Sequence, residues 1–202
     1  MAVSENKPAN TSQIFILASA SPRRKALLEQ ISFPPDRIIA ADIDESVRAG
    51  ELAPRYAIRL ATEKAKKVAK DHPNDLVLAA DTVVACGRRI LPKAEDEEVA
   101  RQCLKLLSGR AHRVYSGVAL AGPDDGICLR TVETRLKVRR LSPQNIDEYI
   151  ASGEWRGKAG GYAIQGLFAK HVISLIGSYT NVVGLPLYET ANLLDGAGRP
   201  RS

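Results

Sequence analysis

Hydrophobic and polar positions alternate along this chain in blocks that predict strands and helices in turn. Short apolar strands are expected at 14–17 and 37–40, with a helix between them. The clearest helix is predicted over 54–71, where one apolar stripe recurs at helical spacing: Ala57, Leu60, Ala61, Ala65 and Val68. A nearly continuous apolar run at 76–85 is typical of a strand buried on both faces. The alternation of strands and helices predicts an α/β fold.

The second half of the chain continues this pattern. The expected elements are a helix at 95–107, strands at 113–121 and 127–141 joined by a hairpin loop at 122–126, a helix from Ser142-Pro143 to about Ser152, a strand at 172–176, and a final helix ending near Leu194. Polar residues alternate with apolar ones along 127–141, so one face of that strand is polar. Basic side chains on this face suggest nucleic acid, but ordinary exposure to solvent is the better explanation.

The loop after the first strand carries a candidate anion site. Ser21 is a good helix N-cap, and Pro22 suits the first helical position. Arg23 and Arg24 then lie in the first helical turn, where the helix dipole normally favours acidic residues. Two guanidinium groups beside unpaired backbone N–H groups suit a phosphate. The alternative is that both arginines extend into solvent, which is easier to accept for one of them than for both.

Lys64 departs from the polar face of its predicted helix. It falls near the middle of the apolar stripe, between Leu60 and Val68. A lysine at such a position either extends past the edge of the core or points its ammonium group into a pocket. We favour the pocket.

Acidic residues follow two of the predicted strands. Asp81 and Thr82 interrupt the apolar run, and we expect them at a strand end, where α/β proteins place ligand groups. The alternative is a capping aspartate in a bend between two strands. Asp42, Asp44 and Glu45 follow the strand at 37–40 and provide oxygen ligands that suit Mg²⁺ together with phosphate, although loop carboxylates are usually just solvated.

Composition sets the class of protein. The chain has 202 residues, 45% hydrophobic and 26% charged, which suits a single globular domain over 13–195. The polar segment 1–12 is expected to be a disordered tail and 196–202 a flexible one, and no apolar run is long enough to span a membrane. Three separated cysteines favour a reducing, cytoplasmic location over a disulfide framework. The net charge of +6 is dispersed and suits nucleotides or nucleic acid without selecting either.

A glycine-rich segment at 157–166 permits close approach of a ligand to the backbone or is simply a flexible connection. The segment from Gly153 to Lys158 is not a P-loop, because its glycine spacing is too short and Ala159 replaces the required hydroxyl residue. The three histidines have no metal-ligand spacing, which argues against zinc hydrolysis.

Five sequence blocks together resemble the Maf family of nucleotide pyrophosphatases. The blocks, in chain order, are Ala18–Arg24, Arg59–Ala65, Ala80–Val83, Gly160–Gly166 and Asn181–Pro186. The resemblance implies an elongated mixed twisted sheet flanked by helices, related to the inosine triphosphatases, and a homodimer. It implies hydrolysis of a nucleoside triphosphate to monophosphate and pyrophosphate with a divalent cation, Mg²⁺ or Mn²⁺, and a role in removing non-standard nucleotides or in cell-division arrest. Tyr162 to Gly166 resemble the dTTP/UTP branch.

The resemblance also implies roles for individual residues. Asp81 matches the proton acceptor, and Glu45 would share the metal with it. The expected substrate-binding and specificity residues are Ser21, Arg23, Lys64, Thr82, Lys93 and Gln165. Because the resemblance singles out Arg23 of the two arginines, Arg24 is expected to extend into solvent. One departure is that Ala94 follows Lys93 where proline is usual. A nucleotide-responsive regulator of septum formation without enzymatic activity is the main alternative, and a nucleic-acid-binding domain ranks last; neither nucleic acid nor a membrane is an expected partner.

Overall fold

The structure, a computed structural model, describes residues 13–123 and 126–201, so the tail predicted over 1–12 and part of the hairpin loop lie outside the described residues. The strands of this part of the chain are β1 (Phe15–Leu17), β2 (Arg37–Ile38), β3 (Leu76–Cys86), β4 (Arg89–Leu91), β5 (Lys93–Ala94), β6 (Ala111–Ala121), β7 (Ile127–Val138), β8 (Lys158–Ala159) and β9 (Val172–Ile176). The helices are α1 (Pro22–Gln30), α2 (Ala53–Ala69), α3 (Glu97–Leu107), α4 (Pro143–Ala151), the 3₁₀ helix η1 (Leu167–His171), α5 (Tyr179–Val183) and α6 (Leu187–Gly196).

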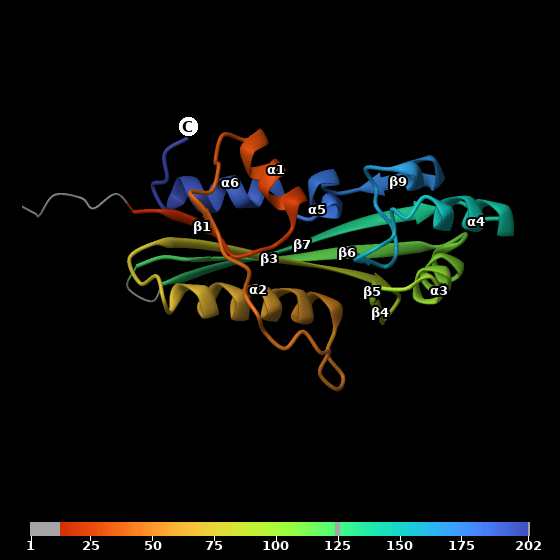
Figure 1. Ribbon diagram of the computed structural model, residues 1–202, viewed down its shortest axis with the longest axis horizontal. Coiled ribbons are helices and arrows are strands. Elements are labelled where there is room, and N and C mark those ends of the chain that lie inside the picture. Colours follow the sequence, from red (N-terminus) through yellow and green to blue (C-terminus); the bar gives the residue numbers. More distant parts are fainter. Residues whose placement is uncertain (1–12, 124–125, 202) are drawn as a thin grey trace, which may run out of the picture.

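A long mixed sheet forms the centre of the molecule, with strands in the order β2-β1-β3-β6-β7-β9 and β4 added beside β3. β1 pairs with β2 and β3 in parallel, and the other pairs are antiparallel. β5 and β8 form a separate two-stranded sheet. The expected mixed α/β fold is therefore confirmed, and the molecule is elongated along the strands of β3, β6 and β7 (Figure 1).

Helices cover both faces of this sheet. α2 lies along one face, while α1, α5 and α6 lie on the opposite face. α3 and α4 pack at the end of the molecule that is opposite the start of β1 (Figure 1). One hydrophobic core fills the side of α1, α3, α4 and α6, and a smaller one lies between α2 and the sheet. None of the helices in the described chain is long and apolar enough to cross a membrane.

The helical stripe predicted for α2 is confirmed, since all five of its apolar residues are buried. α2 approaches the sheet most closely at Gly117 of β6. A Cβ atom there would lie 2.4 Å from the carbonyl oxygen of Ala57 and 2.5 Å from Cα of Ile58. Only glycine therefore permits this contact between helix and sheet. Lys64 lies on the same buried side of α2 and is 7% exposed.

β3 has a gap along one edge. β6 follows its other edge, whereas the gapped edge pairs with β1 at Leu76–Leu78 and with β4 at Val84–Cys86. Residues 79–83 lie between these two partners and have no strand beside them on that edge in the described part of the chain. The expectation that Asp81 and Thr82 mark a strand end is therefore wrong: both lie inside a continuous strand, and it is the neighbouring strand β1 that stops.

Other local predictions hold with shifted ends. The polar face of β7 is confirmed, and α4 begins with a capping box between Ser142 and Asn145. α3 begins at Glu97 because Asp96 caps it. After the end of α6, Arg199 forms an ion pair with Asp36 at 2.9 Å.

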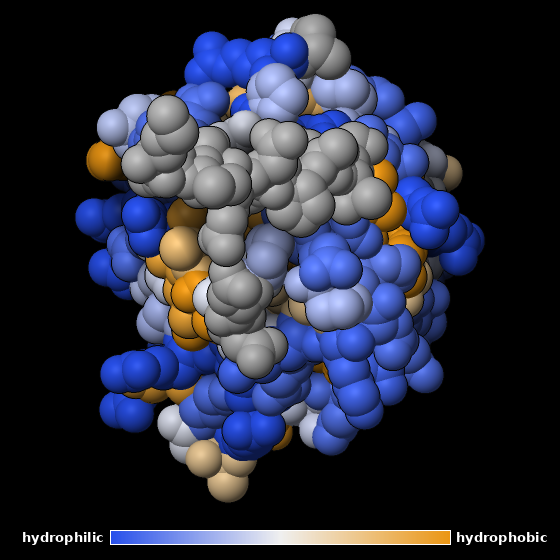
Figure 2. Space-filling view, turned by 90° about the vertical axis from the view of Figure 1, so that its left-hand side faces the viewer, coloured by the Kyte–Doolittle hydropathy of each residue, from blue (hydrophilic) through white to orange (hydrophobic). Residues whose placement is uncertain are grey.

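The end of the molecule near the start of β1 has a mostly hydrophilic surface where it is visible (Figure 2).

Candidate active site

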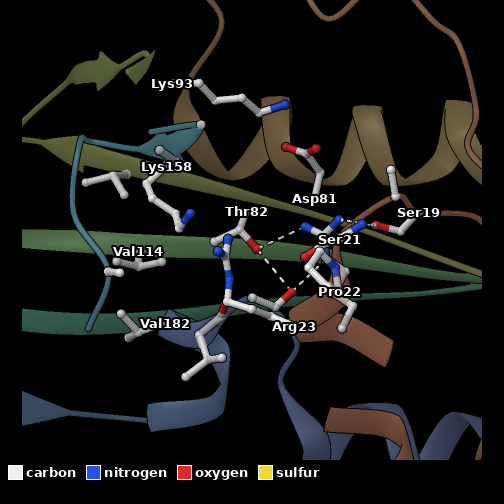
Figure 3. Close-up of a pocket in the computed structure, with 18 of the residues that line it drawn as sticks. Ser19, Ser21, Pro22, Arg23, Asp81, Thr82, Lys93, Val114, Lys158 and Val182 are labelled. Atoms are coloured by element: carbon white, nitrogen blue, oxygen red, sulfur yellow. Dashed lines mark hydrogen bonds between the residues drawn. The ribbon is translucent and has the colours of Figure 1, made fainter. Parts of the chain in front are cut away.

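A cavity of about 470 Å³ opens at the gap in β3. Its sides come from the loop between β1 and α1, the middle of β3, the β5–β8 ribbon, the glycine-rich segment and the connection from α5 to α6 (Figure 3). Since β1 ends where the cavity begins, both faces of β3 contribute to it. Asp81 contacts α2 on one face, and Thr82 contacts β6 and the α5–α6 connection on the other.

One end of the cavity holds two carboxylates and two lysines. The Lys64 ammonium lies 2.6 Å from Oδ1 of Asp81 and 2.7 Å from Oε1 of Glu45. Lys93 reaches the other oxygen of Glu45 at 2.7 Å. Asp81 is 5% exposed, so its charge is stabilised in the low-dielectric interior by the buried ammonium group of Lys64. The interpretation that Lys64 points into a pocket is confirmed.

Glu45 is the acidic-loop residue that reaches the cavity; Asp42 and Asp44 do not line it. Burial alone would raise the pKa of Glu45, but hydrogen bonds from Lys64 and Lys93 outweigh burial and lower that pKa to about 2. Glu45 is therefore ionised throughout the physiological pH range. Asp44 instead accepts a hydrogen bond from the backbone N–H of Ser46 at 2.9 Å, as a loop residue exposed to solvent does.

Arg24 is not solvated, contrary to the expectation. Its Nε donates to the carbonyl oxygen of Gly184 at 2.9 Å, and its terminal nitrogens donate to Ser19 at 2.8 Å and Thr82 at 3.4 Å. Burial lowers the pKa of Arg24, an effect that the nearby Asp81 carboxylate opposes. Local sequence does not indicate this role, because the acceptor Gly184 lies 160 residues further along the chain.

Arg23 lines the cavity as predicted. Its Nε donates to the carbonyl oxygen of Val183 at 3.2 Å, and burial lowers its pKa. Ser21 also lines the cavity and is the N-cap residue of α1, but its hydroxyl makes no capping hydrogen bond. Pro22 is at the start of α1, as expected. The start of this helix therefore faces the cavity with its side-chain cap unused.

The β5–β8 ribbon brings two lysines to the cavity. Lys93 pairs with Ala159, and Ala94 pairs with Lys158. Lys158 lines the cavity but was not among the predicted site residues. The only local signal for it was the glycine-rich composition of its segment.

The glycine-rich segment folds back over β3. Gly160 has a φ of +68°, and a Cβ atom there would lie 2.9 Å from the side chain of Val84, so a side chain is excluded on two counts. The buried Tyr162 hydroxyl makes a 2.8 Å hydrogen bond with Nε2 of His112. This bond anchors the segment to β6 and leaves Gln165 exposed at the cavity, with its amide group available to a ligand.

All the predicted site residues come together in this one cavity. Its lining includes Ser21, Arg23, Glu45, Lys64, Asp81, Thr82, Lys93 and Gln165. No group of three or more potential metal-ligating His, Cys, Asp or Glu residues occurs in the described residues. The cavity thus combines a carboxylate end with several cations, which is the arrangement expected of an α/β protein that binds phosphorylated ligands.

Comparison with known proteins supports the fold and identifies the family of this chain. The fold is similar to that of a HAM1 protein from Coxiella burnetii, with a TM-score of 0.52 and 17% identity over 92% of this chain and 100% of that chain. Residues 14–197 match the family described as Maf-like protein, so this chain belongs to the Maf family.

Curated relatives share most of the sequence. The dTTP/UTP pyrophosphatase of Paramagnetospirillum magneticum is 60% identical over 185 residues, which cover 92% of this chain and 97% of the relative. The dTTP/UTP pyrophosphatase of Caulobacter vibrioides is 59% identical over 183 residues, covering 91% and 95%. The resemblance seen in the five sequence blocks is therefore confirmed.

Proposed function

We propose that this protein is a nucleoside triphosphate pyrophosphatase that hydrolyses dTTP and UTP to the monophosphate and pyrophosphate. The observation that carries the proposal is the buried Asp81 carboxylate, held by Lys64 inside a cavity that also contains Arg23, Arg24 and Lys93. The relatives named dTTP/UTP pyrophosphatase, at about 60% identity over almost the whole chain, support the same activity.

In the proposed reaction, Asp81 orients a water molecule and accepts its proton. The water oxygen attacks the α-phosphorus, the bond from that phosphorus to the bridging oxygen breaks, and pyrophosphate leaves with the bond electrons. Positive charge from Arg23, Lys64 and Lys93 stabilises the charge that develops on the phosphate oxygens. Lys64 also fixes the orientation of Asp81 through the 2.6 Å contact.

The carboxylate end fits a divalent cation that binds together with the nucleotide. Mg²⁺ and Mn²⁺ bind through one or two carboxylates plus substrate phosphates and water, and Asp81 and Glu45 provide two such carboxylates on either side of the Lys64 ammonium. When bound there, the cation would supply electrophilic activation of the α-phosphate. With Lys64 between them, the carboxylates suit a cation that arrives with the phosphates rather than one held by protein alone.

We assign base recognition to the other end of the cavity. Gln165 offers both a donor and an acceptor, which complement the O4 and N3–H edge shared by thymine and uracil. The cavity lining also includes the apolar side chains of Val114, Ile164 and Val182, which suit packing against a base. Arg23 and Thr82 complete the specificity set that the family resemblance implies.

The test is release of pyrophosphate from a panel of triphosphates with Mg²⁺. We expect dTTP and UTP to be preferred over ATP, CTP and 7-methyl-GTP. Asp81→Asn should lower kcat by about 10³-fold, the scale of a lost general base, whereas Asp71→Asn, an exposed acid outside the cavity, should not. A preference for a purine would remove the role of Gln165, and near-normal turnover in Asp81→Asn would remove Asp81 from the mechanism.

The same experiment separates the enzyme from a regulator of septum formation. A nucleotide-responsive regulator without enzymatic activity would bind dTTP but release no pyrophosphate. If the enzyme is confirmed, a link to cell-division arrest would act through nucleotide levels, and Asp81→Asn should abolish it in cells.

We also propose that the protein is a cytoplasmic homodimer. Ile173, Ile176 and Tyr179, in and just after the edge strand β9, are 58%, 68% and 48% exposed, which is unusual for large apolar side chains so close together. Light scattering tests the dimer. The unpaired cysteines of the described chain, Cys86, Cys103 and Cys128, suit a reducing compartment.

A further inference from the structure

The positively charged groups that line the cavity divide into a set that forms ion pairs with carboxylates and a set that does not. At the carboxylate end, Lys64 and Lys93 form ion pairs with Asp81 and Glu45. The other cations of the lining, Arg23, Arg24 and Lys158, form no ion pair with a carboxylate within the described ranges. The cavity therefore contains three positive charges that the protein itself does not balance by direct pairing.

The Arg24 side chain donates its hydrogen bonds to other groups of the protein, whereas Arg23 and Lys158 keep donors that are free to bind a ligand. All three hydrogen bonds of Arg24 go to Ser19, Thr82 and Gly184. Arg23 uses only Nε, so both of its terminal nitrogens are available. The Lys158 ammonium donates one hydrogen bond, to the carbonyl oxygen of Arg156 at 3.0 Å, and has two further N–H donors.

Lys158 and Arg23 extend toward one another beside Thr82 (Figure 3). Burial and then the charge of Arg23 lower the pKa of Lys158, and the opposing effect of Glu154 is smaller. Two like charges that converge in a partly buried cavity are unfavourable unless an anion joins them. The space between them thus suits a ligand group that carries negative charge.

We propose that Lys158 is a substrate-binding residue that, together with Arg23, holds an oxygen of the nucleotide's phosphate chain. This inference rests on the proposed function. A phosphate oxygen fits better than a carbonyl oxygen of the base, because neutral carbonyls are served by neutral donors such as Gln165, whereas two full charges call for an anion. The β5–β8 ribbon then positions two lysines in the site. Lys93 faces the carboxylate end, and Lys158 faces Arg23.

The test measures binding of UMP and of inorganic pyrophosphate, with Mg²⁺, by calorimetry on the full chain. Lys158→Met keeps the length of the side chain and removes its charge. Losing a charge-assisted hydrogen bond should weaken binding of at least one of these two ligands by about 10- to 100-fold. Lys158→Arg should restore most of that affinity. Lys170→Met is the matched control, since this exposed lysine pairs with Glu148 outside the cavity.

A merely structural role would not give this pattern. If Lys158 binds phosphate, the ratio of kcat/KM for UTP to that for CTP should stay the same in Lys158→Met. The proposal would be overturned if Lys158→Met bound both ligands as tightly as Lys170→Met does. It would also be overturned if Lys158→Met bound both ligands normally but had a changed ratio of kcat/KM for UTP to that for CTP. Neither result would contradict the proposed pyrophosphatase activity. An unaltered protein that binds neither ligand and releases no pyrophosphate would overturn both.

Discussion

Replacing Lys64 by methionine tests the charge arrangement of the active site most directly. The Lys64 ammonium lies between Asp81 and Glu45, at 2.6 Å and 2.7 Å, and its side chain is 9% exposed. Methionine fills nearly the same volume but leaves Asp81 without a cation, whereas Glu45 keeps its ion pair with Lys93. The folded protein then carries an uncompensated buried charge at Asp81.

The expected size of the effect follows from burial. Removing one partner of a buried ion pair typically costs about 3–5 kcal/mol, so the free energy of unfolding of Lys64→Met should fall by about that amount. Lys93→Met is the matched control, because Lys93 pairs with Glu45 alone and its side chain is 49% exposed. An exposed pair contributes about 0–1 kcal/mol, so this variant should be nearly as stable as the unaltered protein.

Urea unfolding in the absence of nucleotide measures the loss of stability, and its repetition with Mn²⁺ measures how much stability the cation restores. In Lys64→Met no ammonium group lies between Asp81 and Glu45, so Mn²⁺ should bind between these carboxylates in the folded state and restore part of the lost stability. The unaltered protein should gain little from Mn²⁺. Equal destabilisation of the two lysine variants would refute the argument, and so would a Mn²⁺ effect as large in the unaltered protein as in Lys64→Met.

Two further predictions concern the scaffold. Burial lowers the pKa of His112 to about 4 from an ordinary value of 6.5, so the unfolded chain takes up a proton before the folded one as pH falls, and stability is lost between pH 6.5 and 4. Between pH 7 and pH 5 this loss should be about 2 kcal/mol, and His112→Gln should reduce the pH dependence by that amount in urea unfolding. Gly117→Ala should destabilise the protein by at least about 1–3 kcal/mol, because its Cβ would meet the backbone of α2 at 2.4 Å. Gly196→Ala, whose Cβ would meet nothing within 4 Å, is the control, and equal melting temperatures for the two glycine variants would contradict the contact.

Features set by local periodicity were predictable from the sequence. The spacing of apolar residues in α2 is a property of one helix, so both its buried stripe and the unusual position of Lys64 followed from counting residues. The helix start at Ser21-Pro22 and the capping of α4 are likewise local. Arg23, Glu45, Lys64, Asp81 and Thr82 were candidates on local chemistry, whereas Lys93 and Gln165 came only from the family resemblance.

Features that depend on distant partners were not predictable in the same way. Asp81 was expected at a strand end because a buried carboxylate inside a strand is unfavourable, and what permits it is Lys64, 17 residues away on α2. Arg24 was expected in solvent because the family resemblance singles out Arg23 alone. What holds Arg24 is its acceptor Gly184, which lies 160 residues further along the chain. Local sequence does not indicate Lys158 either, because only the pairing of β5 with β8 brings it to the cavity.

The separation between the two arginines and their acceptors has a consequence for biosynthesis. Arg23 and Arg24 leave the ribosome early, but the carbonyl groups of Val183 and Gly184 that hold them follow 160 residues later. Contacts this distant along the chain close late and carry a loop-closure entropy. A nascent or truncated chain that stops before residue 183 can therefore form much of the sheet while its phosphate-binding loop still lacks its anchors. The two arginines should therefore take up their positions in the cavity only after residues 183 and 184 have been synthesised.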